Sequence, residues 1–159
     1  MTPRMESFPQ TTVVGKYVEM SLKDHRTFAL WQSFMQELKL VKGRLNTELI
    51  SLQIVPVPFK FNPDARFTKW ACCAVENSST IPDSMESLTI PQGLYAVFIH
   101  KGAATSAPKT FGYIFGEWIP NSIYDIDSRP HFEILGDKYK NDHPNSEEEI
   151  WIPIKEKSN

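Results

Sequence analysis

The stretch EEEIWIPI, residues 147–154, places a carboxylate and an indole two positions apart on a predicted strand. Side chains two apart on a strand share one face of the sheet, so Glu149 and Trp151 should point the same way. If that face is covered, the two residues form an apolar wall that carries one negative charge. Such a wall suits a flat or cationic organic ligand.

Upstream of this strand, some segments show the apolar spacing that is typical of strands, and others show the spacing that is typical of amphipathic helices. The first half predicts a strand at 11–20, a helix that a capping box at 21–24 opens, and strands at 49–57 and 67–75. The second half predicts a strand at 93–100, a helix from Ser106 or Ala107 that Pro120 stops, and strands at 131–135 and 148–154. The order strand, helix, strand, strand therefore occurs twice.

A unit of one helix and three strands covers only one face of its sheet, so two such units should associate through their sheets. We therefore predict an α+β fold of duplicated strand-helix-strand-strand units, with antiparallel sheets, pseudo-twofold symmetry and a central ligand cleft. Residues 1–159 would form one domain, with a first repeat over about 10–76 and a second over about 91–155.

Composition narrows the classes of function. The net charge is −2, and the 17 basic residues are interspersed with 19 acidic ones, so nucleic acid is not an expected partner. No apolar run is long enough for a membrane span or resembles a signal peptide, and the two cysteines are adjacent, which favours a reduced, cytoplasmic setting. Scattered histidines and the missing cofactor fingerprints predict no metal and no cofactor.

Two glycines one turn apart, Gly112 and Gly116, interrupt the second predicted helix at a cost of roughly 1 kcal/mol each. Close approach of the helix to the sheet would explain them, and so would room for a ligand beside Phe115 and Trp118. We expect the close approach.

Four ordered segments resemble the GyrI-like small-molecule-binding domain, which also serves as the effector-binding module of AraC-type and MerR-type multidrug regulators. The segments are GLYAVFIHKG (93–102), FGEWIPNS (115–122), RPHFE (129–133) and EIWIPI (149–154). The resemblance covers nearly the whole chain in element order. It implies a duplicated fold with a central cleft, and a stand-alone ligand-binding member without its own helix-turn-helix domain.

The resemblance also implies site residues. Drug-sensing members of the family hold lipophilic cations against a buried glutamate, and the matching position here is Glu149. From position alone, the candidate walls are Trp151, Tyr95, Trp118, Trp70 and Phe115. For Glu149, the plain alternative is a solvated charge at the start of a strand, and for the tryptophans it is burial in the core. Glu133 would either share the site or pair with Arg129, and we expect the surface pair.

Three hypotheses about function follow. The leading one is a sensor or sequestering module for an aromatic or lipophilic small molecule, either cationic or neutral. The second, an activity described for some GyrI-like proteins, is hydrolysis of electrophilic cyclopropane-type genotoxins, with Glu149 as general base and Tyr95 or Tyr113 as hydrogen-bond donor. The third is a role with a protein partner, such as gyrase inhibition.

Overall fold

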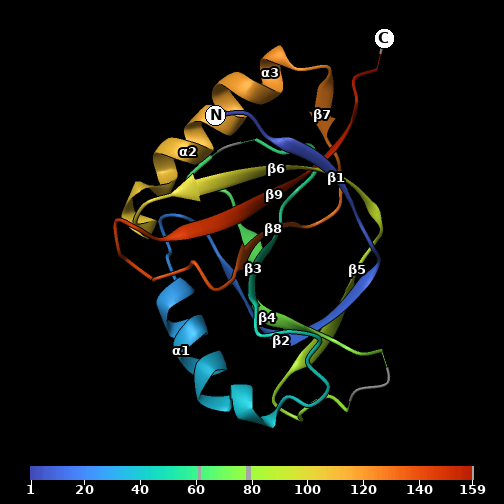
Figure 1. The fold of residues 1–159 in the computed structure, drawn as a ribbon, viewed down its shortest axis with the longest axis vertical. Coiled ribbons are helices and arrows are strands. Elements are labelled where there is room, and N and C mark those ends of the chain that lie inside the picture. The colour runs from blue at the N-terminus through green and yellow to red at the C-terminus, as the bar shows by residue number, and fades with distance from the viewer. Residues whose placement is uncertain (61, 78–79, 159) are drawn as a thin grey trace.

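The computed structural model describes residues 1–60, 62–77 and 80–158 and shows a nine-stranded antiparallel sheet with helices on one face (Figure 1). Its strands are β1 (Arg4–Phe8), β2 (Thr11–Met20), β3 (Leu49–Ile54), β4 (Phe67–Val75), β5 (Glu86–Ile90), β6 (Gly93–Lys101), β7 (Tyr124–Ile126), β8 (His131–Leu135) and β9 (Glu147–Glu156). Its helices are α1 (Thr27–Glu37), α2 (Ala107–Tyr113) and the short α3 (Ile119–Asn121), with 3₁₀ turns at Leu38–Leu40 and Ala104–Ser106 and a π-helical segment at Ile114–Trp118.

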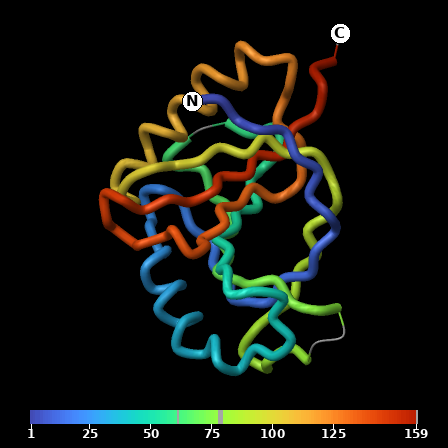
Figure 2. Tube along the Cα trace, viewed as in Figure 1, coloured from blue at the N-terminus to red at the C-terminus, as the bar shows by residue number. Residues whose placement is uncertain are grey.

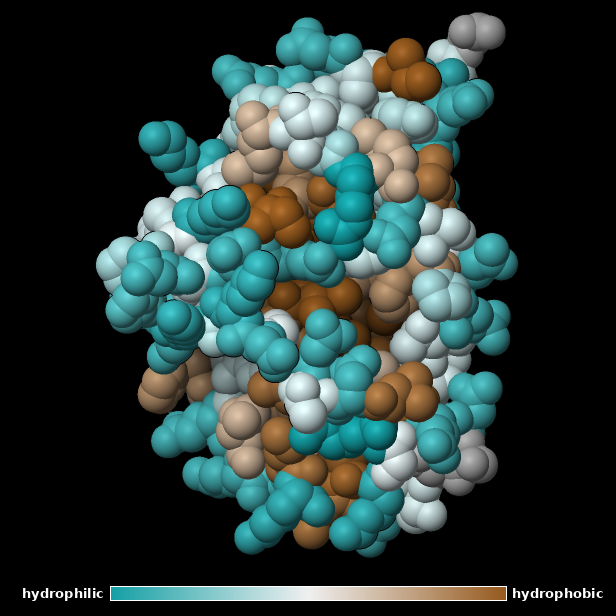
Figure 3. All heavy atoms as spheres, viewed as in Figure 1, coloured by the Kyte–Doolittle hydropathy of each residue, from teal (hydrophilic) through white to brown (hydrophobic). Residues whose placement is uncertain are grey.

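The strands follow the order β1-β6-β9-β8-β3-β4-β2-β5, and β7 adds to β9. The middle of the sheet is the pair of β3 and β8, where Leu52 lies opposite Phe132. The N-terminal segment links the two ends of this order, because it runs from β1, beside β6, to β2, beside β5 (Figure 2). In the face seen in Figure 3, hydrophobic side chains gather in hollows that hydrophilic residues border.

One face of the sheet carries a continuous aromatic core. Phe132 and Trp151 stack at 5.5 Å between ring centroids, and Tyr95 meets Trp151 edge-on at 5.8 Å. Phe8 from β1 approaches Phe132 at 4.9 Å, and Trp70 from β4 is buried in the same cluster. Rings of this size bury more apolar area than any other side chain, so this cluster is the main source of hydrophobic stabilisation.

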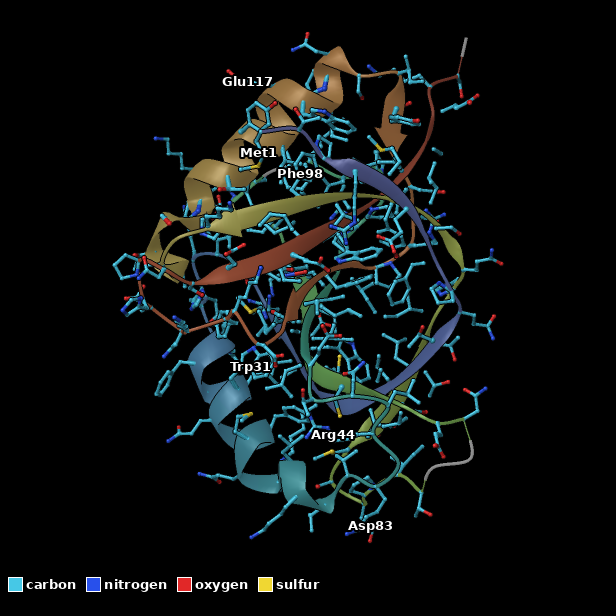
Figure 4. The ribbon with its side chains drawn as sticks, viewed as in Figure 1. Met1, Trp31, Arg44, Asp83, Phe98 and Glu117 are labelled. Atoms are coloured by element: carbon cyan, nitrogen blue, oxygen red, sulfur yellow. The ribbon has the colours of Figure 1, made fainter. Side chains whose placement is uncertain are left out.

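The opposite face is covered by two separate helices. Leu30 and Phe34 of α1 pack on the β2–β4 end of the sheet, while Ile114, after α2, packs with Phe98 and Ile150 on the β6–β9 end. Figure 4 shows Trp31 on α1 and Phe98 beneath the helix that begins with α2. The middle strands β3 and β8 therefore lie between the two covered ends.

The predicted strands at 11–20, 67–75 and 131–135 are confirmed at both ends. Three short strands, β1, β5 and β7, were not predicted. Each has only three to five residues and is stabilised by pairing with a distant strand, a contact that local sequence does not report.

Two predicted helix boundaries were wrong. Ser21 Oγ accepts a hydrogen bond from the Asp24 amide at 3.0 Å, but this is a turn, and α1 begins at Thr27. The second helix also continues past Pro120, which lies inside α3. The π-helical segment just before it changes the carbonyl register, so the proline ring is tolerated in the first turn of α3.

The structure supports neither of the two explanations considered for the glycines of the second helix. A Cβ added at Gly112 or Gly116 would meet no atom within 4 Å, and both residues are exposed. The expected close approach to the sheet was therefore wrong at these positions, and no ligand space is needed to explain them.

Candidate functional site

A cavity of about 510 Å³ opens on the helical face, in the region that neither apolar helix cluster fills. Its floor comes from β3, β4 and β8, one side from α2 and the π-helical segment, and the other from the loops that follow β2 and β3. The lining is mostly apolar, and the volume is within the range of small-molecule sites.

Strand register places the polar residues of the floor in one row. Gln53 on β3 is opposite Lys69 on β4 and opposite His131 on β8, so the three side chains lie on neighbouring strands. Glu133, two residues along β8 from His131, shares its face. Gln53 Nε2 donates to both Glu133 carboxylate oxygens, at 3.1 and 3.3 Å.

Burial is the largest influence on the pKa values of the titratable residues in this row. Burial raises the pKa of Glu133 to about 7, although the charge of Lys69 opposes the shift and that of Glu148 adds to it. Burial also lowers the pKa of Lys69, against the attraction of Glu133 and Glu148, and lowers the pKa of His131 to about 4. The cavity floor therefore holds a carboxyl group that changes charge near neutral pH.

Several polar atoms of the floor have no hydrogen-bond partner among the described residues. Gln53 Oε1 and His131 Nε2 are buried without one. Lys69 is only 8% exposed, and its ammonium makes neither a hydrogen bond nor a close ion pair with a described residue. Buried polar groups are normally paired, so these atoms are available to a ligand that enters the cavity.

Aromatic rings form the walls. Phe59 lies 4.7 Å from Phe115 and 5.3 Å from His131, measured between ring centroids, and Phe111 stacks parallel to Phe115 at 6.2 Å. Phe59 comes from the loop after β3 and the other two rings come from the second helix, so the rings of these two elements are in direct contact. The arrangement offers flat apolar surfaces to an aromatic guest.

Of the wall residues predicted from sequence, Phe115 lines this cavity. Trp151, Tyr95 and Trp70 lie in the aromatic core on the other face of the sheet. Trp118 packs edge-on against Phe98 at 5.3 Å, under the second helix. The geometry therefore corrects the placement of these four residues, because strand alternation directs the first three away from the cavity.

Glu149 also lies outside this cavity. Its carboxylate pairs with Arg4 at 2.8 Å and accepts a hydrogen bond from Trp151 Nε1 at 3.1 Å, with 34% of the side chain exposed. Glu149 and Trp151 do share a face, as predicted, but it is the face of the aromatic core. The cavity carboxylate is Glu133, and the expected Glu133–Arg129 pair was wrong because Arg129 pairs with Asp127 at 2.8 Å.

The two tyrosines considered as hydrogen-bond donors are also directed elsewhere. Tyr95 donates to the Pro130 carbonyl at 2.8 Å, and Tyr113 donates to the Met1 carbonyl at 3.0 Å. Figure 4 shows Met1 beside the second helix. Neither hydroxyl reaches the floor row. The sequence signal that locates Glu133 is its alternation with Phe132 on β8, which separates a core-facing ring from a cavity-facing carboxyl group.

Comparison with known proteins settles the family, since the GyrI-like small molecule binding domain matches residues 1–155. The chain belongs to this family. SAV2435 bound to tetraphenylphosphonium has a similar structure, with a TM-score of 0.75 and 20% identity, covering 98% of this chain and 94% of that one. The EcmrR C-terminal domain gives a TM-score of 0.74 and 16% identity, covering 98% of both chains.

A hydrolase from Listeria innocua also has a similar structure, with a TM-score of 0.59 and 14% identity, covering 97% of this chain and 92% of that one. No curated relative matches the sequence. Among the described residues of this GyrI-like domain, no helix has the length and apolar character that a membrane crossing needs.

Proposed function

We propose that this GyrI-like domain binds a small aromatic molecule in the cavity between α1 and the second helix. The observation that carries the proposal is the lining itself: three phenyl rings in contact with one another line a cavity whose floor holds one buried carboxyl group. Phe59, Phe111 and Phe115 supply stacking surfaces, and Glu133 supplies an acidic group in a low-dielectric setting. A carboxyl group there favours a positively charged group on the guest.

The family supports this proposal, because its name describes small-molecule binding and one structural neighbour holds tetraphenylphosphonium. We extend to this chain the role of a sensor or sequestering module for aromatic or lipophilic compounds. The acidic position moves from Glu149 to Glu133, because Glu133 lies in the cavity and Glu149 is paired with Arg4.

We infer further that the fold is a duplication around this cavity. In the sheet order, the first unit runs β2, β4, β3 inward and the second runs β6, β9, β8 inward, so the two halves mirror each other about the β3–β8 pair. The strand before each unit pairs with the other unit. A cavity over the β3–β8 pair would then be the cleft between repeats of about 10–76 and 91–155.

Fluorescence anisotropy with rhodamine 123, a flat aromatic cation, tests the proposal. We expect saturable binding by the wild type. Phe115→Ala should weaken binding about tenfold because a stacking surface is lost, and Glu133→Gln should weaken it by a similar factor because the acidic group is lost. Glu149→Gln is the matched control, since it removes a carboxylate outside the cavity and should leave the affinity unchanged.

Equal losses in Glu133→Gln and Glu149→Gln would contradict the assignment of the acidic group. Binding that Phe115→Ala leaves intact would place the dye elsewhere on the protein. If the wild type bound neither rhodamine 123 nor tetraphenylphosphonium, the proposed function would be wrong.

One observation favours a second candidate function, hydrolysis of an electrophilic small molecule. A carboxyl group with a pKa of about 7 is suited to general base chemistry at neutral pH, and Glu133 meets that requirement. In this reaction Glu133 would take a proton from water as the oxygen attacks a ring carbon of an activated cyclopropane. The carbon–carbon bond breaks, its electron pair stays on the carbon that bears the activating groups, and Glu133 returns the proton to that carbon. Mass spectrometry of a geminal cyclopropane diester should then show gain of one water with wild type and none with Glu133→Gln.

A further inference from the structure

The cavity floor contains a cation of its own, which a simple cation-binding site would not need. Lys69 lies on β4 in register with Gln53 and lines the same cavity as Glu133. A methionine or leucine at this position would fill the same volume at no electrostatic cost. A lysine that is 8% exposed therefore indicates a use for its charge.

The protein itself leaves this ammonium only partly compensated. Glu133 and Glu148 attract it, but no described residue makes a hydrogen bond or a close ion pair with it. The nearest strand neighbour in register, Gln53, directs its amide nitrogen to Glu133 instead. Lys69 lines the cavity, so a ligand that enters can accept hydrogen bonds from its ammonium group.

We propose that the preferred ligand is zwitterionic: a flat aromatic molecule whose cationic part lies toward Glu133 and whose anionic oxygen group binds Lys69. This inference rests on the proposed function and specifies its ligand class. The unpaired Gln53 Oε1 and His131 Nε2 lie in the same row and offer further hydrogen bonds to the polar edge of such a molecule.

Charge complementarity supports this class over a lipophilic cation alone. A guest with only a positive charge gains the attraction of Glu133 but is repelled by Lys69, and inside an apolar cavity both effects are larger than in water. A guest with only a negative charge is attracted by Lys69 but repelled by Glu133. A guest with both charges satisfies both residues, so the pair acts as a specificity filter.

Two dyes with one ring system test the inference by fluorescence anisotropy at pH 7.5. Rhodamine 110 carries a carboxylate beside its cationic xanthene, and rhodamine 123 is its methyl ester, so only the negative charge differs. We expect the wild type to bind rhodamine 110 at least fivefold more tightly. Lys69→Met should abolish this preference or reverse it, by weakening rhodamine 110 and strengthening rhodamine 123.

Lys69→Gln provides a second variant of similar length that keeps a polar group, and the thermal unfolding midpoint of each variant verifies folding. The ratio of the two dye affinities in the wild type also tests the inference without any substitution. Tighter binding of rhodamine 123, or a ratio that both Lys69 variants leave unchanged, would overturn the zwitterion proposal while the binding function stands. Failure of both dyes to bind would overturn the zwitterion proposal, and failure of tetraphenylphosphonium to bind as well would overturn the binding function.

Discussion

The two faces of the central strands differ, because alternating residues of the same strands point into a packed core on one face and into an open cavity on the other. On β8, Phe132 points into a packed aromatic core and is fully buried, while its neighbours His131 and Glu133 point into an open cavity. On β9, Trp151 belongs to the core and Ile152 to the cavity lining. One face is filled and the other is kept hollow.

The difference shows how a small domain can hold a cavity with buried polar residues on its floor. Every described strand pairing is antiparallel and ties both faces to one backbone, so close packing on the core face holds the positions of the cavity residues. The cavity face can then keep buried charges and unpaired polar atoms, whose cost the core offsets. The aromatic core stabilises one face, and the proposed ligand recognition belongs to the middle of the other face, between its two apolar clusters.

The largest expected effect separates the two faces by stability. Phe132→Ala should lower the free energy of unfolding by about 3–5 kcal/mol, because it leaves a cavity in the core. Phe115→Ala, on the partly exposed wall of the binding cavity, should cost about 1 kcal/mol and mainly weaken ligand binding. Urea unfolding measures both. Equal losses of stability would mean that the cavity wall is part of the structural core.

A smaller effect concerns pH. Because burial raises the pKa of Glu133 to about 7, its contribution to stability is present below pH 4.5 and is lost as the pH rises toward 7. Glu133→Gln removes this loss, so between pH 4.5 and 7 the variant should gain up to about 3 kcal/mol relative to wild type.

Other titrating groups face Glu133, and the comparison must hold them constant. The charges of Lys69 and Glu148 act on the pKa of Glu133. The pKa of His131 is lowered to about 4, so its contribution to protein stability is lost as the pH falls below 6.5, whereas that of Glu133 is lost as the pH rises. These groups are present in both proteins, so the difference between their urea unfolding curves reports Glu133 together with its electrostatic coupling to Lys69. A difference that does not change with pH would show that Glu133 stays ionised or solvated.

The smallest effect lies outside both regions, on the exposed side of the second helix. Gly112→Ala adds a methyl group that meets no neighbour and removes the backbone freedom of glycine in the unfolded chain. We expect thermal unfolding to show a gain of about 0.5–1 kcal/mol, with unchanged dye affinity. A loss of stability would mean that this helix face has a steric constraint.

Most of the fold was predictable because its main signals are local. Apolar periodicity located the long strands and both helices, and four motifs identified the family. The short strands β1, β5 and β7 were missed because distant partners stabilise them. The helix that continues through Pro120 was missed because a π-helical segment, which no local pattern indicates, precedes the proline.

The site was less predictable for a related reason. The sequence by itself determined which residues share a face, since strand alternation correctly grouped Glu149 with Trp151. Only the tertiary structure decided what covers each face: aromatic rings from four other strands fill one, and two separated helices leave the middle of the other open. Coverage depends on elements distant in the chain, so the choice between Glu149 and Glu133 required the packed fold.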